Sequence, residues 1–190
     1  TLVLTLMLGT PLINTSCGAA SADRYTQEIL RISGGLVFPD SDHDPGPGWL
    51  VGGALGLALN RTVLISLNYD HVDLDVPAYR AAGQTVNPVT VQVELGMPYK
   101  HRTTPRFGVG AGVYLRTREF NPPRVPFGIE TERIRSRSYL PFGMNFGGGV
   151  SIPLWKRTVV DVDARYHQTM GSSETIVMGT VTAGLTYALR

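Results

Sequence analysis

The sequence lacks the features that define several large classes of protein. It contains one cysteine, Cys17, so neither an intramolecular disulfide framework nor a multi-cysteine metal site can form. No apolar run reaches the roughly eighteen residues that a transmembrane helix requires. Charged residues make up 17% of the 190 residues and the formal net charge is +2, which excludes the basic stripe typical of nucleic-acid-binding proteins. A chain of this length is expected to form one domain.

The sequence does contain segments in which bulky apolar residues alternate with small or polar ones. In residues 160–166, Val160 and Val162 alternate with Asp161 and Asp163. Side chains of a β-strand point to opposite faces with a period of two, so such a segment has one apolar face and one polar face. The same alternation predicts eight strands, at residues 25–37, 49–59, 62–69, 89–97, 106–117, 138–152, 158–168 and 175–189.

The predicted connections between these strands differ in length. Long loops are expected at residues 38–48, 73–87 and 119–137, and shorter connections at residues 60–61, 98–105, 153–157 and 169–174. Short turns at one end, longer loops at the other and an even number of strands are typical of outer-membrane barrels. We therefore predict an all-β fold, an eight-stranded antiparallel up-and-down transmembrane β-barrel.

The polarity of the two faces decides which side of the barrel is solvated. A soluble up-and-down barrel of the lipocalin type has an apolar interior and a charged exterior. Here the bulkier face is the apolar one, and the polar face is rich in glycine, alanine, serine, threonine and asparagine. Small residues suit the narrow interior of an eight-stranded barrel. We therefore expect the polar face inside and the apolar face against lipid, which disfavours the soluble ligand-binding barrel.

The polar face also carries charges of both signs, which we expect to form a network in the lumen. Buried charges are costly unless they are paired. A structural plug of ion pairs is favoured at this barrel size, and a gated, narrow conduit for small solutes is the alternative. The predicted luminal residues are Arg31, Asp70, Glu94, Arg116, Asp161, Asp163, Arg165 and His167.

The first residues have the composition of a secretory signal peptide. An apolar run at residues 2–8 is followed by small residues that end in Ala20-Ser21-Ala22, which resembles a cleavage site. The basic start of such a signal is missing, so we expect residues 1–22 to be a truncated signal peptide and residues 23–190 the barrel domain.

The last predicted strand contains the most specific local motif of the sequence. Its apolar residues alternate to the end of the chain, at Val181, Ala183, Leu185, Tyr187 and Leu189. Residues 23–190 resemble the small eight-stranded outer-membrane barrels, the group of the OmpA membrane domain and the OmpX and OmpW proteins. This porin-like resemblance implies a monomer in the outer membrane of a Gram-negative-type bacterium, with a structural or surface-interaction role in the cell envelope. It also implies contact with lipopolysaccharide, recognition by the barrel assembly machinery, and no cofactor, metal or nucleic acid.

One segment supports an enzymatic alternative. His167, Thr169, Ser172 and Glu174 loosely resemble the catalytic stretch of the lipid A deacylases, in which a histidine activates a hydroxyl nucleophile. Thr169 stands where that family has serine, and His167 shares its parity with the luminal residues rather than with the lipid-facing ones. We therefore predict that the protein is not an enzyme, with a lipid A-modifying hydrolase as the alternative.

The longest predicted loop is rich in arginine. Arginine clusters bind phosphates and carboxylates, and the outer leaflet offers lipopolysaccharide phosphates. The simpler interpretation is a solvated loop, because Glu119, Glu130 and Glu132 offset part of the charge. The candidate anion-binding residues are Arg124, Arg133, Arg135 and Arg137.

Overall fold

A computed structural model of the chain describes residues 27–40, 46–60, 62–74, 83–96, 102–120, 135–171 and 175–189. The proposed signal peptide lies outside these residues. Within them, no helix is long and apolar enough to cross a membrane. They form the strands β1 (Gln27–Pro39), β2 (Gly48–Ala58), β3 (Val63–Leu74), β4 (Gly83–Leu95), β5 (Thr104–Phe120), β6 (Arg135–Tyr139), β7 (Phe142–Trp155), β8 (Thr158–Met170) and β9 (Val177–Ala188).

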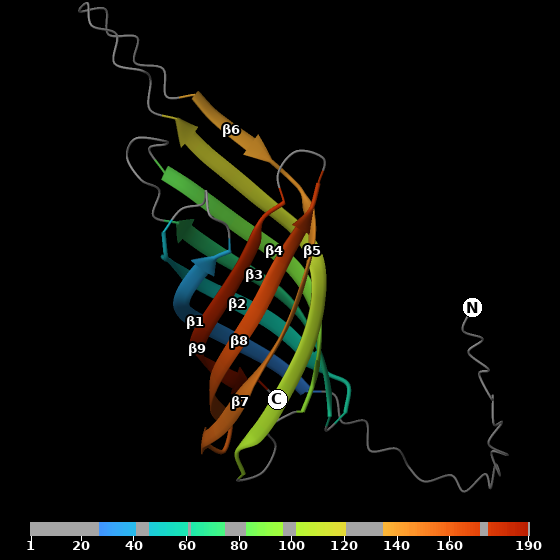
Figure 1. The fold of residues 1–190 in the computed structure, drawn as a ribbon. Coiled ribbons are helices and arrows are strands. Elements are labelled where there is room, and N and C mark those ends of the chain that lie inside the picture. Colours follow the sequence, from blue (N-terminus) through green and yellow to red (C-terminus); the bar gives the residue numbers. More distant parts are fainter. Residues whose placement is uncertain are drawn as a thin grey trace, which may run out of the picture.

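These strands close into a barrel. Their hydrogen-bonded order is β4-β3-β2-β1-β9-β8-β7-β5-β6, and a further antiparallel pairing of β4 with β5 closes the ring. Both β6 and β7 pair with β5, one beyond the other along its length. Together they therefore occupy one strand position of the barrel. The nine strands therefore make the predicted eight-stranded antiparallel barrel, whose tilted strands are seen in Figure 1.

The barrel has two distinct ends. Residues 59–62, 96–103 and 156–157 connect strands at one end, which we call the turn end, and β1 begins and β9 finishes there. Residues 40–47, 75–82, 121–134 and 171–176 connect strands at the other, which we call the loop end. By the rule for outer-membrane barrels, the turn end is periplasmic and the loop end is external.

Several predicted boundaries were wrong, and proline bears on two of them. The predicted strand 138–152 is interrupted by Leu140 and Pro141, because proline has no N–H for the ladder; its carbonyl instead accepts a hydrogen bond from the Tyr114 N–H at 2.9 Å. The predicted loop 73–87 is too long, because β3 continues to Leu74 and β4 already begins at Gly83. Pro88 lies inside β4, where the register with β3 is interrupted but the pairing with β5 continues.

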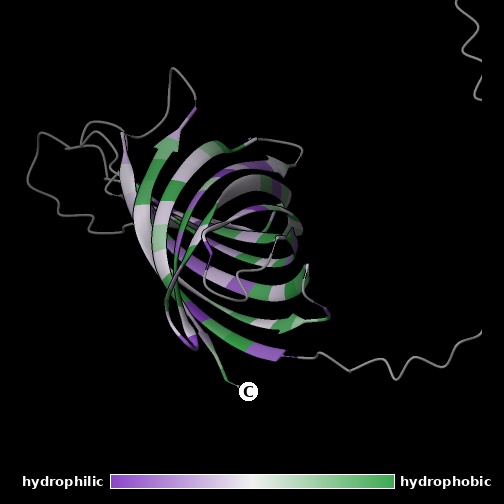
Figure 2. Ribbon diagram, turned by 90° about the horizontal axis from the view of Figure 1, so that it is seen from below, coloured by the Kyte–Doolittle hydropathy of each residue, from purple (hydrophilic) through white to green (hydrophobic). Residues whose placement is uncertain are grey.

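The exterior of the barrel is apolar, as predicted. Figure 2, a view from below, shows hydropathy alternating along the strands that surround the lumen. A band of exposed apolar side chains this extensive is not found on soluble monomers, and only hydrocarbon satisfies it. The band includes Ile32, Leu55, Leu67, Val91, Val109, Phe146, Val162 and Leu185.

The lumen is layered along the barrel axis, which the sequence analysis did not predict. Its middle holds polar and charged side chains, and buried apolar clusters lie toward both ends. At the turn end, Ile29, Ala58 and Leu64 form a small buried cluster. Toward the loop end, a larger buried cluster contains Val37, Leu50, Val72, Leu74, Val86, Tyr114, Ile176 and Met178.

Candidate functional site

A network of buried ion pairs occupies the middle of the lumen, with Glu94 of β4 as its central acceptor. The carboxylate of Glu94 is 2% exposed and accepts hydrogen bonds from three guanidinium groups. Arg31 of β1 donates at 2.8 and 3.0 Å, Arg106 of β5 at 2.9 Å and Arg165 of β8 at 2.9 Å. Glu94 therefore connects three other strands across the lumen.

Two aspartates of β8 complete the network. Asp161 accepts hydrogen bonds from the hydroxyls of Ser151, at 2.5 Å, and Thr186, and lies 3.4 Å from Arg31 and Arg106. Asp163 pairs with Arg106 and lies 3.9 Å from Arg165. Three arginines thus face three carboxylates, so the network is electrically neutral.

This neutrality matters because of where the charges lie. An isolated charge removed from water costs several kcal/mol, and only close pairing with further hydrogen bonds compensates that cost. The charges of the network come from β1, β4, β5 and β8, so the pairing is complete only when the barrel is closed in its correct register. The network is therefore well placed to specify the closed barrel.

Glycines on the luminal face make room for these long side chains. A Cβ at Gly147 would lie 2.6 Å from Cγ of Arg165 and 2.3 Å from the carbonyl oxygen of Ala164. At Gly149 it would lie 2.5 Å from Oδ1 of Asp163. The glycine-rich stretch of β7 thus permits the close approach of the β8 charges.

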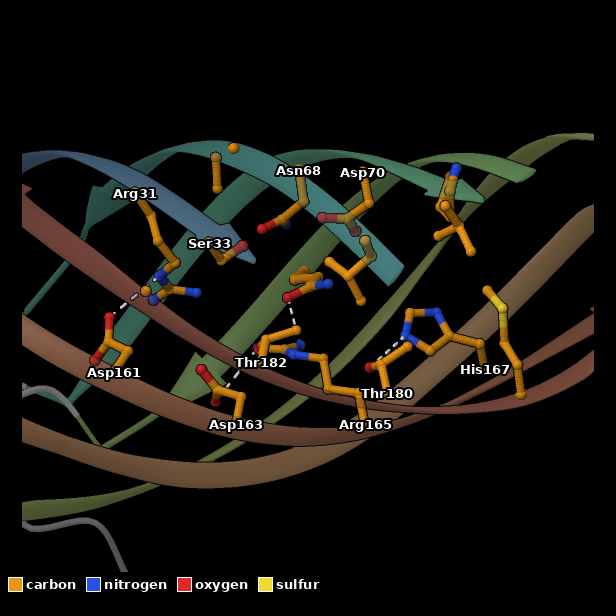
Figure 3. Close-up of a pocket in the computed structure, with 18 residues that line it drawn as sticks. Arg31, Ser33, Asn68, Asp70, Asp161, Asp163, Arg165, His167, Thr180 and Thr182 are labelled. Carbon is orange, nitrogen blue, oxygen red and sulfur yellow. Dashed lines mark hydrogen bonds and ion pairs between the residues drawn. The ribbon is translucent and has the colours of Figure 1, made fainter. Parts of the chain in front are cut away.

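Asp70 and Arg116 stand apart from the central network, although both are among the predicted luminal residues. Asp70 lines a small cavity of about 40 Å³ together with Arg31, Asp163 and Arg165 (Figure 3). That volume holds only about three water molecules. Arg116 lies nearer the loop end, where its guanidinium donates to Oε1 of Gln84 at 3.1 Å.

His167 faces the lumen, and both of its ring nitrogens lie near a hydroxyl. Nδ1 is 3.0 Å from the Tyr114 hydroxyl. Nε2 is 3.4 Å from the Thr180 hydroxyl (Figure 3). The hydroxyl of Thr169, the nucleophile of the enzymatic alternative, instead accepts a hydrogen bond from the Ile176 N–H at 2.8 Å. His167 is 4% exposed and Thr169 1%, so neither faces lipid. Ser172 and Glu174 lie outside the described residues.

Arg106 is the member of the network that the sequence analysis missed. It stands at the start of β5, where Pro105 precedes it and the predicted strand began, so it was not counted as luminal. Its even number gives it the same parity as Gly108 and Gly110 of the polar face. That parity is the signal by which it was recognisable.

The structure describes only part of the predicted arginine cluster. Arg124 and Arg133 lie outside the described residues. Arg135 and Arg137 belong to strand β6 rather than to the predicted loop 119–137, and Arg137 is the register partner of Arg118. The side chains of Arg135 and Arg137 are not among those described.

Comparisons with known proteins agree on the fold. No protein-family model matches the chain, and no curated protein sequence does. Among solved structures, Neisserial surface protein A matches with a TM-score of 0.65 at 11% identity, over 85% of this chain and 96% of that one. The outer-membrane protein OprG of Pseudomonas aeruginosa matches with a TM-score of 0.56 at 12% identity, over 86% and 96%. The chain has the fold of the small eight-stranded outer-membrane β-barrels.

An eight-stranded outer-membrane barrel accounts for both faces of the wall. The apolar band requires hydrocarbon around it, and a closed barrel leaves no backbone group unpaired within the bilayer. Transmembrane barrels with an even number of antiparallel strands are a feature of bacterial outer membranes. The fold and its polarity together place the chain in an outer membrane.

Proposed function

We propose that this outer-membrane barrel has a structural or surface-interaction role and does not conduct solutes through its lumen. The layered lumen carries this proposal. A neutral network fills the middle, buried apolar clusters lie on both sides of it, and the cavity lined by Asp70 and Arg165 has a volume of only about 40 Å³. A continuous aqueous path would have to disrupt all three layers at once.

Conductance of the refolded protein in a planar bilayer tests the closed lumen. We expect no discrete current steps from the unmodified protein, while a large porin refolded in the same way calibrates the assay. The double variant Glu94→Ala and Arg106→Ala removes an oppositely charged pair without changing the net charge, and we expect it to stay closed as well, because the apolar clusters on both sides of the network remain. Discrete steps from the unmodified protein would contradict the proposal.

Because the lumen is closed in this proposal, the external surface at the loop end is the part of the barrel that is available to bind partners. Strand β5 extends past the register of β7 and pairs there with β6, so this wall rises at the loop end (Figure 1). The arginines of this region, Arg124, Arg133, Arg135 and Arg137, suit the phosphates of lipopolysaccharide as a partner. The barrel assembly machinery is the partner expected during insertion, and a monomer is the expected state.

Charge reversal tests the lipopolysaccharide contact. We expect Arg135→Glu with Arg137→Glu to weaken binding to vesicles that contain lipopolysaccharide. Arg102→Glu changes an exposed arginine at the opposite, turn end and serves as the control, against which each single reversal, Arg135→Glu or Arg137→Glu, is also compared. Equal affinity of the two variants would count against this surface role.

A further inference from the structure

The turn between β7 and β8 presents an unusual combination of side chains at the membrane boundary. Trp155 ends β7 and is 74% exposed, more than any other large apolar side chain among the described residues. Lys156 and Arg157 form the turn that follows, and both are exposed. Neither cation has a carboxylate within ion-pairing distance among the described residues, since none of the salt bridges there includes them.

The backbone fixes the position of this corner. The register of β7 with β8 shifts between Pro153 and Trp155, so that Trp155 becomes the partner of Thr158. Thr158 in turn is the partner of Tyr187 in β9. The carbonyl of Arg157 accepts a hydrogen bond from the Ala188 N–H at 2.9 Å, which ties the turn to β9. Trp155 and the exposed Tyr187 therefore lie on either side of Thr158 at the same rim.

Chemistry at this rim matches a lipid headgroup. Indole and phenol rings favour the boundary between hydrocarbon and water, and exposed cations beside that boundary attract anionic headgroups. The turn end faces the periplasmic leaflet. The exposed acidic residue Glu28 lies at the same rim on β1, which pairs with β9 and is separated from β7 by β9 and β8; among the described residues it forms no ion pair with Lys156 or Arg157.

We infer that the corner formed by Trp155, Lys156, Arg157 and Tyr187 binds the phosphate headgroup of an anionic phospholipid in the periplasmic leaflet. The two rings anchor the corner at headgroup depth, and the two cations select anionic over zwitterionic lipid. On the order of five-fold preference is expected for each cation at low salt. This site does not depend on whether the lumen conducts.

Trp49 provides an internal comparison at the other rim. It lies at the loop end, with its ring centroid 5.6 Å from that of His71 and with Asp73 as its register partner. No lysine or arginine is adjacent to it in the chain, where Gly48 and Leu50 flank it. The sequence holds two tryptophans, so each can be studied alone.

Fluorescence quenching by spin-labelled lipids tests the inference. Trp49→Phe leaves Trp155 as the reporter, and Trp155→Phe leaves Trp49. Each protein is refolded into phosphatidylcholine vesicles with a small fraction of phosphatidylglycerol or phosphatidylcholine that carries a nitroxide. We expect Trp155 to be quenched several-fold more effectively by labelled phosphatidylglycerol, and Trp49 equally by both lipids.

Two further measurements identify the source of the preference. Lys156→Gln with Arg157→Gln should abolish it at Trp155, with folding checked by heat-modifiable electrophoretic migration. In the protein with an unmutated turn, about 0.5 M NaCl should also suppress the preference of Trp155 for labelled phosphatidylglycerol, because salt screens the attraction between exposed charges. Equal quenching of Trp155 by the two lipids at low salt would overturn the inference and leave only an aromatic anchor. So would a preference that persists in the folded double variant.

Discussion

Replacement of Glu94 by glutamine tests the luminal network at its centre. The variant keeps the size of the side chain but leaves three guanidinium groups facing two carboxylates in the middle of the barrel. Glu94 is 2% exposed and accepts four hydrogen bonds from Arg31, Arg106 and Arg165. Removal of one partner of a buried ion pair typically costs about 3–5 kcal/mol. We expect the free energy of unfolding to fall by that amount.

Urea unfolding of the refolded protein in lipid vesicles, followed by tryptophan fluorescence, measures this change. The control Glu28→Gln removes an exposed carboxylate with no ion pair among the described residues, and should change the free energy of unfolding by less than about 0.5 kcal/mol. The double variant Glu94→Gln and Arg165→Gln restores neutrality, so it should lose less than the sum of the single variants, by about 0.5–3 kcal/mol. A Glu94→Gln protein as stable as its control would refute the reasoning.

Two further predictions concern the wall of the barrel. Val91→Arg places a charge on the lipid-facing side of β4, where Val91 is exposed, and should destabilise the inserted barrel by about 2–4 kcal/mol; an unchanged urea midpoint would show that hydrocarbon does not contact this face. Gly147→Ala forces a Cβ to within 2.3 Å of the Ala164 carbonyl oxygen, so the strands must shift and the yield of heat-modifiable folded protein should drop. The control Ala164→Gly changes an exposed position on the neighbouring strand, and an equal yield from both variants would contradict the steric argument.

The sequence was sufficient to predict the fold because the alternation of side chains repeats in every strand. The opposed faces of Val162 and Asp163 in β8 illustrate why this works. The alternation of polar and apolar side chains is a local property of each strand. Because the bulky apolar residues share one face, that face is the one expected to contact lipid, and the opposite face is the one expected to line the lumen. Strand ends were predicted less well, because proline was read as a loop signal. Pro88 is nonetheless accommodated within β4.

The arrangement of the site depended on contacts that no local pattern encodes. Parity placed Glu94 and Arg31 on one face, but it did not show that these residues, 63 positions apart, would meet across the lumen. Arg106 was missed because it lies at a strand end, where the alternation is shortest. The apolar layers at both ends of the lumen were also missed. Val37 and Val72 lie at positions whose parity is luminal, but both are apolar. In the sequence they cannot be told apart from the apolar residues of the exterior.

The depth of a tryptophan at position 162 tests the central claim most directly, because Val162 is 43% exposed on the face assigned to hydrocarbon. Val162→Trp, in a protein that also carries Trp49→Phe and Trp155→Phe, is refolded into vesicles of phospholipids brominated at defined chain depths. We predict the strongest quenching by bromines near the ends of the acyl chains. Emission that these bromines leave unquenched would place residue 162 away from lipid and contradict the orientation of the whole barrel wall.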